Sequence, residues 1–264
     1  MSVYTSFADN RSLISKMVRR EIAGRYKGSV LGVFWSLINP VIMLAVYTFV
    51  FSFVFNARWS IDSGSKTEFA LALFIGLMTH SLFSECINKA PTLIVSNINY
   101  VKKVVFPLDI FPWVSMGAAI FHFLISFAVW ACMFALVTHS FNWTAIFLPI
   151  IFFPLILFTV GLTWILSSLG VYLRDISQVT GVITTVMLFL APVFYPISAL
   201  PEQYHIYIYA NPLTLIIEQS RDVLMWGVLP DFRALAIATL IALAVAFLGY
   251  WWFDKTRRGF ADVL

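Results

Sequence analysis

A run of basic residues that passes directly into a long uncharged stretch is the feature that most constrains this chain. Arg19, Arg20, Arg25 and Lys27 lie in the basic part, and residues 28–57 carry no charge. At about 1.5 Å per residue, a helix of that length crosses the roughly 30 Å hydrocarbon core of a bilayer. The junction therefore predicts a membrane surface, and its positive charge indicates the cytoplasmic side.

Composition extends this prediction to the whole chain. Apolar residues make up 61% and charged residues 11% of its 264 residues, against about 45–50% and 25% in soluble domains. A chain of this length has room for several membrane spans but for no large soluble domain. We therefore expect an all-α polytopic membrane protein.

Uncharged runs of helical length predict six transmembrane helices. The charge-free run from Ile110 to Leu173 is too long for one helix, so HSFNW at 139–143 is expected to separate two of them. The predicted spans are about 31–55, 69–88, 111–137, 144–172, 176–195 and 234–253. The predicted division is an interface helix in residues 1–30 and a transmembrane domain in residues 31–264.

The segment Ser12–Gly24 is predicted to form an amphipathic helix on the membrane surface. At 100° per residue, one half of its helical wheel is apolar and most of the other half is basic or polar. The apolar half contains Leu13, Ile14, Met17, Val18 and Ile22. Glu21 falls within that apolar half, so its carboxylate either meets a protein partner or extends to the interface.

Residues 196–233 differ in character from the spans. Four prolines interrupt apolar pieces that are too short to cross a bilayer. Such pieces predict re-entrant or surface-lying helices between spans five and six, with a plain extracellular loop as the alternative. Glu218, Arg221 and Asp222 follow there at helical spacing.

Basic residues predict the orientation of these spans. Of the 17 lysines and arginines, 13 fall on the side of the two termini and the remaining four are Arg58, Lys66, Arg221 and Arg233. Because cytoplasmic loops carry the excess of basic residues, both termini are predicted to be cytoplasmic.

The predicted spans carry no series of ionisable groups at mid-membrane, such as proton- or ion-coupled pumps need. Glu85 lies near the cytoplasmic end of span two, where we expect it to pair with Lys89 one turn later. His80 and His122 are expected to be hydrogen-bonded packing residues. The sequence has no GxxxxGK[ST] phosphate loop and no metal-ligand spacing, so we expect no catalytic residue, metal or cofactor, and an energy source in another protein.

Aromatic residues are abundant, at 17% of the chain with 26 phenylalanines. Tyr47, Phe51 and Phe55 recur every four residues and share one face of the first span. The fifth span ends with a second group, which contains Phe189, Phe194 and Tyr195. Aromatic rings stack on the apolar faces of sugars, which makes both groups candidates for a sugar path; lipid-facing bulk and interfacial belts are the alternative.

Five sequence blocks resemble the membrane subunit of ABC-2-type polysaccharide exporters, most of all those of O-antigen. They lie in the family's order and cover most of the chain. The blocks are RREIAGRYKGSVLGVFWSLINPVIMLAVYTFVFSFVF at 19–55, NINYVKKVVFPLDIFP at 97–112, GVYLRDISQ at 170–178, APVFYPIS at 191–198 and ANPLTLIIEQSRDVL at 210–224.

The resemblance implies a homodimer in the bacterial inner membrane, paired with two cytoplasmic ATPase subunits. It implies a lipid-linked polysaccharide as substrate, contact with membrane lipids, and no nucleic acid. Spans one, two and five are expected to line the channel, and Glu218, Arg221 and Asp222 to belong to periplasmic gate helices. The residues expected to couple to the ATPase are Arg19, Arg20, Glu21, Arg25, Lys102, Lys103, Arg174 and Asp175.

Three alternatives remain at this stage. The same architecture also exports capsule or teichoic-acid polymers. A membrane-embedded glycan or lipid transferase needs clustered acids at the membrane surface for metal–phosphate chemistry, and Asp109 and Asp175 are isolated from other acids. A stand-alone secondary carrier needs broken-helix symmetry, which the sequence does not display.

Overall fold

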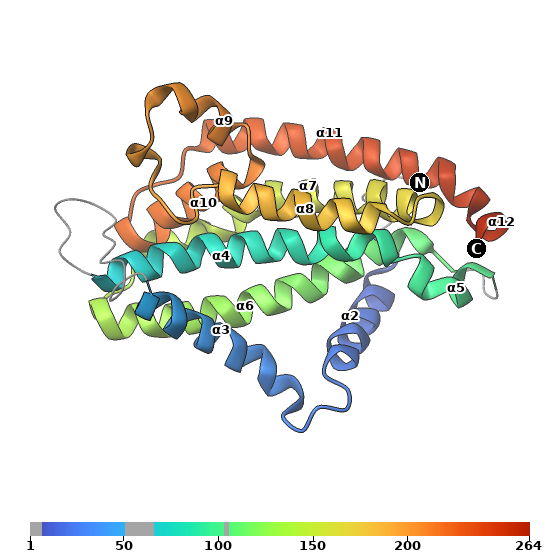
Figure 1. Cartoon of the computed structure of the whole chain (residues 1–264), viewed down its shortest axis with the longest axis horizontal. Coiled ribbons are helices and arrows are strands. Elements are labelled where there is room, and N and C mark those ends of the chain that lie inside the picture. The colour runs from blue at the N-terminus through green and yellow to red at the C-terminus, as the bar shows by residue number, and fades with distance from the viewer. Residues whose placement is uncertain (1–6, 51–65, 103–105) are drawn as a thin grey trace.

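The computed structural model describes residues 7–50, 66–102 and 106–264. This part of the chain is helical and contains no β-strand, as expected. Four long helices form the body of the molecule: α4 (Lys66–Lys89), α6 (Phe111–Thr138), α7 (Leu148–Tyr172) and α11 (Phe232–Thr256) (Figure 1). The shorter helices are α2 (Arg11–Arg25), α3 (Trp35–Tyr47), α5 (Ile98–Lys102), α8 (Ile176–Leu190), α9 (His205–Tyr209), α10 (Pro212–Arg221) and α12 (Phe260–Val263).

Five helical segments are long and apolar enough to cross a membrane. They are Gly32–Val50, Thr67–Thr92, Leu108–Thr138, Trp143–Tyr172 and Phe232–Val263, and they coincide with five of the six predicted spans. The remaining prediction, residues 176–195, corresponds to α8, which has 15 residues. This helix ends at Leu190 because Ala191, which precedes Pro192, adopts an extended conformation (φ −92°, ψ 152°).

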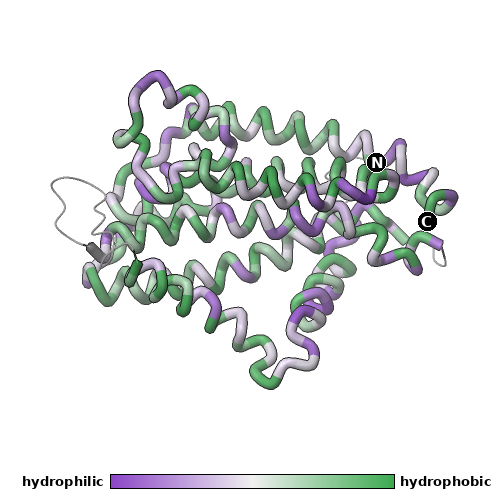
Figure 2. Tube along the Cα trace, viewed as in Figure 1, coloured by the Kyte–Doolittle hydropathy of each residue, from purple (hydrophilic) through white to green (hydrophobic). Residues whose placement is uncertain are grey.

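The spans differ greatly in how far the rest of the protein covers them. In the most apolar part of the second span, 78% of the residues are buried inside the protein, whereas only 11% are buried in the corresponding part of the first span. Helix α4 therefore lies at the centre of the bundle, whereas α3 packs at its edge, mainly on α6, and diverges from it toward α2 (Figure 1). Figure 2 shows hydrophobic residues along the long helices and hydrophilic residues concentrated in α2 and at the two ends.

Helices α7 and α11 meet backbone to backbone. A Cβ atom added at Gly249 of α11 would lie 2.2 Å from the carbonyl oxygen of Gly161 in α7, and one added at Gly161 would lie 2.8 Å from the backbone of Ala246. Small residues at such a crossing allow the close van der Waals packing that drives helix association in lipid. The backbones of the two helices are therefore in direct contact at this crossing.

The connection between α2 and α3 contains two glycines in the left-handed region. Gly28 has φ +88° and Gly32 has φ +51°, conformations that other residues adopt only under strain. The chain turns there, so that α2 and α3 diverge from a tip that projects from the bundle (Figure 1). The basic segment and the first span are thus two separate helices joined by a bend.

Replacement of Gly249 by leucine tests the contact between α7 and α11. We expect a marked fall in the Tm of the purified protein in detergent, because overpacking a close contact costs about 1–3 kcal/mol or more. Gly181→Leu in α8 is the matched control, since no heavy atom lies within 4 Å of its added Cβ. Equal thermal stability of the two variants would contradict the assigned contact.

Candidate functional site

Helix α2 forms where the amphipathic helix was predicted, and the structure shows what covers part of its apolar face. Ile14 and Met17 are buried, and the helix packs against α6. The side chain of Val18 lies so close to Gly117 of α6 that a Cβ there would be 2.5 Å from a Val18 methyl group. The protein itself therefore covers much of the apolar face that the sequence assigned to the membrane surface.

Two ion pairs connect the end of α2 to the end of α4. Lys89 pairs with Glu21, which identifies the protein partner left open for this carboxylate. Glu85 pairs instead with Arg25, and both of its carboxylate oxygens lie within 3.0 Å of Nδ1 of His122. The expected pairing of Glu85 with Lys89 is wrong, because each residue meets a closer partner from another helix.

Helix α2 also contacts α5, the short helix between spans two and three. The guanidinium of Arg20 donates a hydrogen bond to the hydroxyl of Tyr100 and lies 5.5 Å from the centre of that ring. Tyr100 in turn packs on Phe106 and Phe111. Two of the elements expected to contact an ATPase are thus joined directly within this chain.

The other predicted coupling residues are located as follows. Arg19, Lys102, Arg174 and Asp175 are exposed, the last two immediately before α8. Lys103 lies outside the described residues. The structure does not bring Arg174 and Asp175 into the contact between α2 and α5, so these residues form a separate exposed site.

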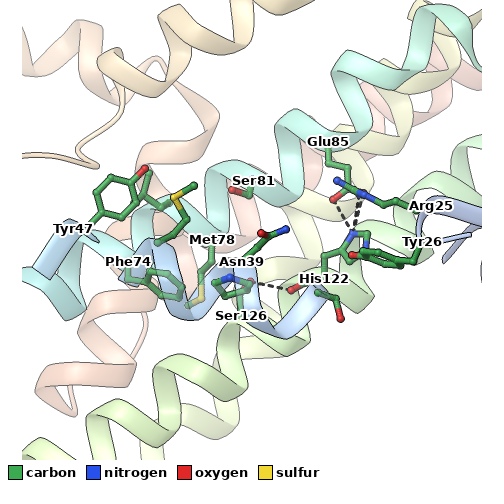
Figure 3. A pocket seen from close by; sticks show the side chains of 14 residues that line it. Arg25, Tyr26, Asn39, Tyr47, Phe74, Met78, Ser81, Glu85, His122 and Ser126 are labelled. Atoms are coloured by element: carbon green, nitrogen blue, oxygen red, sulfur yellow. Dashed lines mark hydrogen bonds and ion pairs between the residues drawn. The ribbon is translucent and has the colours of Figure 1, made fainter. Parts of the chain in front are cut away.

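A cavity of about 330 Å³ lies between α3, α4 and α6 (Figure 3). At one end Arg25, Tyr26, Glu85 and His122 point toward one another. Nε2 of His122 lies 3.2 Å from the Tyr26 hydroxyl, and burial raises the pKa of Tyr26, so that this hydroxyl keeps its proton at neutral pH. The far end is lined by Tyr47 and by apolar side chains of α3 and α4.

Four of the six predicted channel aromatics lie among the described residues. Tyr47 and Phe194 both pack against a small buried cluster of α4 that contains Phe69 and Leu73. Phe194 stacks on Phe189, with ring centroids 5.6 Å apart. The hydroxyl of Tyr195 donates to the carbonyl of Phe189 at 2.9 Å. Phe51 and Phe55 lie outside the described residues.

Arg221, expected at a periplasmic gate, is completely buried. Its guanidinium donates to the carbonyls of Ala72 at 2.9 Å, Pro192 at 2.6 Å and Val193 at 3.1 Å. It also pairs with Glu218 at 2.8 Å. Burial lowers its pKa to about 10, so the side chain stays charged at neutral pH. Arg221 therefore connects α10, α4 and the segment after α8.

Glu218 and Asp222 lie beside Arg221 and are partly exposed. Burial raises the pKa of the Asp222 carboxyl, and the nearby Glu218 raises it further. Asp222 begins a π-helical turn, Asp222–Trp226. Two carbonyls of this turn accept hydrogen bonds from side chains that precede α7: the amide of Asn142 donates to the carbonyl of Leu224, and the hydroxyl of Thr144 donates to that of Val223. The three predicted gate residues thus lie together at the end of α10.

Sequence reasoning missed two residues of these contacts. His122 was expected to be a hydrogen-bonded packing residue; it is hydrogen-bonded, but its charged partners Glu85 and Arg25 were not expected. Tyr100 lies in the block at 97–112, whose resemblance to the exporter family gave this residue no role of its own. The available signal was weak: Arg25 and Glu85 are opposite charges that both lie near the predicted membrane boundary, but they are far apart in sequence.

Comparison with known proteins adds to this geometry. Residues 12–225 match the model of a family described as the ABC-2 type transporter. An O-antigen export system permease protein RfbA of Klebsiella pneumoniae is 27% identical over 254 residues, which are 96% of this chain and 95% of the relative. The Myxococcus xanthus RfbA is 24% identical with the same coverage. A polysialic acid transport protein, KpsM of Escherichia coli, is 23% identical over 93% of both chains.

Replacement of Arg221 by methionine tests its role between the helices. We expect a loss of about 3–5 kcal/mol of stability, because Glu218 and three carbonyls lose their buried donor. Arg221→Lys should recover only part of it, since a single ammonium cannot reproduce the guanidinium fork. The measurement is thermal unfolding in detergent, with Arg233→Met, an exposed arginine, as control. If Arg221→Met unfolds like that control, Arg221 does not hold the helices together.

Proposed function

We propose, on the premise that this chain belongs to the ABC-2 type transporter family, that it is the membrane subunit of an ATP-driven exporter of a lipid-linked, O-antigen-like polysaccharide. The observation that carries the proposal is the match to O-antigen permeases along 96% of the chain. These relatives are transport permease subunits without a catalytic role. The proposal therefore assigns ATP hydrolysis to a separate subunit.

The proposed assembly is a homodimer in the bacterial inner membrane with two cytoplasmic ATPase subunits. Both termini are assigned to the cytoplasm, in agreement with the distribution of basic residues. Helix α8 counts as the sixth membrane-crossing element, and α9 and α10 as re-entrant helices on the periplasmic side. Residues 31–264, which follow the interface helix in sequence, then form the transmembrane domain.

The exposed apolar faces of α3 and α8 support the dimer. Met43 of α3 is 49% exposed, and Val182 of α8 is 65% exposed. Faces of this kind need lipid or protein cover. In the proposed dimer, spans one, two and five of each copy line a channel between the two subunits.

Force from the ATPase enters through α2 and α5 in this mechanism. ATP-driven closure of the nucleotide-binding subunits pushes on α2 and on the segment around residues 97–107. Because Arg20 joins α2 to Tyr100 of α5, both helices move together. Their movement separates the two copies of span one and admits the lipid-linked glycan, with the exposed Arg174 and Asp175 as a second ATPase contact.

The sugar chain then passes along aromatic rings. Tyr47 of α3 and Phe194, which follows α8, pack on the same cluster of α4, and Phe189 of α8 stacks on Phe194. Stacking on rings is tolerant of sugar identity and gives no single deep binding site. Export of a capsule or teichoic-acid polymer by the same route is the second candidate, favoured by the similarity to polysialic acid transport proteins.

Alanine at Tyr47, Phe189 and Phe194 together tests the sugar path. We expect polysaccharide export to fall about tenfold at unchanged protein level, because each ring contact is worth about 0.5–1.5 kcal/mol. Surface polysaccharide is measured by immunoblot beside membrane-protein quantity. Phe153→Ala, which removes an exposed ring of α7, is the control. Normal export by the triple variant would remove these rings from the path.

Charge reversal at Arg19 and Arg20 tests the ATPase contact. We expect the amount of cognate ATPase subunit that co-purifies to fall at least about fivefold, because the proposed interface loses two positive charges and gains two negative ones. Arg233→Glu, at the opposite end of the protein, should leave recovery unchanged. Failure of the unmodified chain to recover any ATPase would contradict the proposed assembly as a whole.

A further inference from the structure

The cavity between α3, α4 and α6 has the length of one bilayer leaflet. Along α4 it extends from Glu85 to Phe74, which is about 16 Å at roughly 1.5 Å per residue. Half of a hydrocarbon core of roughly 30 Å is about 15 Å. A lipid of one leaflet therefore fits its depth.

The two ends of the cavity differ in chemistry (Figure 3). The charged end contains Arg25 and Glu85 together with the Tyr26 hydroxyl, and Ser36, Asn39, Ser81 and Ser126 add further polar groups. The far end is lined by Met43, Phe74, Leu77 and Met78. Methionine is flexible and polarisable and adapts to irregular apolar shapes. The cavity as a whole suits an amphiphile with a polar head and a hydrocarbon chain.

Arg25 and Glu85 both have capacity for another partner. Arg25 is 54% exposed and uses Nη1 for its contacts with Glu85 and His122. Within the described ranges, its Nη2 and Nε groups make no hydrogen bond, and a guanidinium has five donors. Glu85 is 24% exposed, and a carboxylate has about four acceptor positions. An incoming group can thus bind both side chains without breaking their pair.

A second hollow, of about 910 Å³, continues from the charged end between α2 and α4. It shares Arg25, Ser81 and Glu85 with the first cavity and adds the pair of Glu21 and Lys89. The lining of this second hollow contains three cations, Arg20, Arg25 and Lys89, and two carboxylates, Glu21 and Glu85. A headgroup that carries both signs of charge matches it, whereas a purely anionic headgroup meets two carboxylates.

We infer that this cavity binds a zwitterionic aminophospholipid of the bilayer, of the phosphatidylethanolamine class. Its phosphate accepts hydrogen bonds from Arg25 and from the Tyr26 hydroxyl. Its primary ammonium donates to Glu85, and one acyl chain lies along Met43 and Met78 toward Tyr47. The lipid thereby ties the bend between α2 and α3 to α4 and α6. This binding needs neither ATP nor the transported glycan.

Lipid retention by the purified full-length chain tests the inference. The chain is reconstituted in nanodiscs with equal parts of phosphatidylethanolamine, phosphatidylcholine and phosphatidylglycerol, then released for native mass spectrometry. We expect phosphatidylethanolamine to be retained about tenfold over the other two, because it alone supplies both phosphate and ammonium hydrogen bonds without net charge. Equal retention of the three lipids would overturn the inference.

Variants locate the site. Arg25→Gln should lower retention about tenfold, and Glu85→Gln should abolish the preference over phosphatidylcholine. Ser81→Phe narrows the passage between the two hollows and leaves both ion pairs in place, so it keeps the test valid if the charge variants fold poorly. Lys16→Gln removes an exposed cation of α2 outside the cavity and serves as control. Wild-type retention by Arg25→Gln and Ser81→Phe would refute the location.

Two further outcomes separate the lipid from other sources of phosphate. Displacement of the bound lipid by millimolar inorganic phosphate would show a simple anion site and overturn the inference. Recovery of only a lipid-linked glycan from native membranes would assign the cavity to the transported substrate instead. Because these assays need no ATPase, a failure here leaves the proposed export function untouched, and a failure of export leaves this site untouched.

Discussion

Buried carbonyl groups that lose their helical partners must find donors within the protein. The segment after α8 contains such groups, and Arg221 donates to the buried carbonyls of Pro192 and Val193 while it also binds Ala72 of α4. Other side chains donate to backbone carbonyls in the same region. The amides of Asn211 and Asn142 donate to the carbonyls of Met187 and Leu224, and the hydroxyl of Thr144 donates to the carbonyl of Val223. These bonds supply partners for the carbonyls at the irregular end of the molecule, while the end of α8 itself follows from Pro192.

The order and bounds of the long helices follow from the sequence because charges interrupt the apolar runs at nearly every turn between them. The break in α8 was also foreseeable, since Pro192 disfavours a helical residue before it. The burial of Arg221 could not be predicted, because the spacing of Glu218 and Arg221 is also the spacing of an ion pair on an exposed helix surface. Nor could the partners of Glu21 and Glu85, since pairing across helices depends on how α2 packs against α4 and α6. The aromatic residues were found by composition, but only the packing brings Tyr47 and Phe194 to the same cluster.

Helix α4 connects the separate parts of the candidate site. Its first turns carry the cluster on which Tyr47 and Phe194 pack, and the carbonyl of Ala72 binds Arg221. Its last turns carry Glu85 and Lys89, which hold α2. A displacement of α4 therefore alters the aromatic rings, the buried arginine and the basic helix together. The most buried span thus contributes to the aromatic cluster, to the contacts of Arg221 and to the contacts of α2.

The glycine contact between α7 and α11 has a mechanical consequence. Two helices whose backbones touch cannot slide or separate without losing many close contacts at once, so that side of the bundle resists deformation. On the other side, α3 is little covered and is joined to α2 through the left-handed Gly28 and Gly32. Stiffness is thus unevenly distributed: the contact of Gly161 with Gly249 marks the rigid side of the bundle, and the two glycines between α2 and α3 mark the side where the backbone bends.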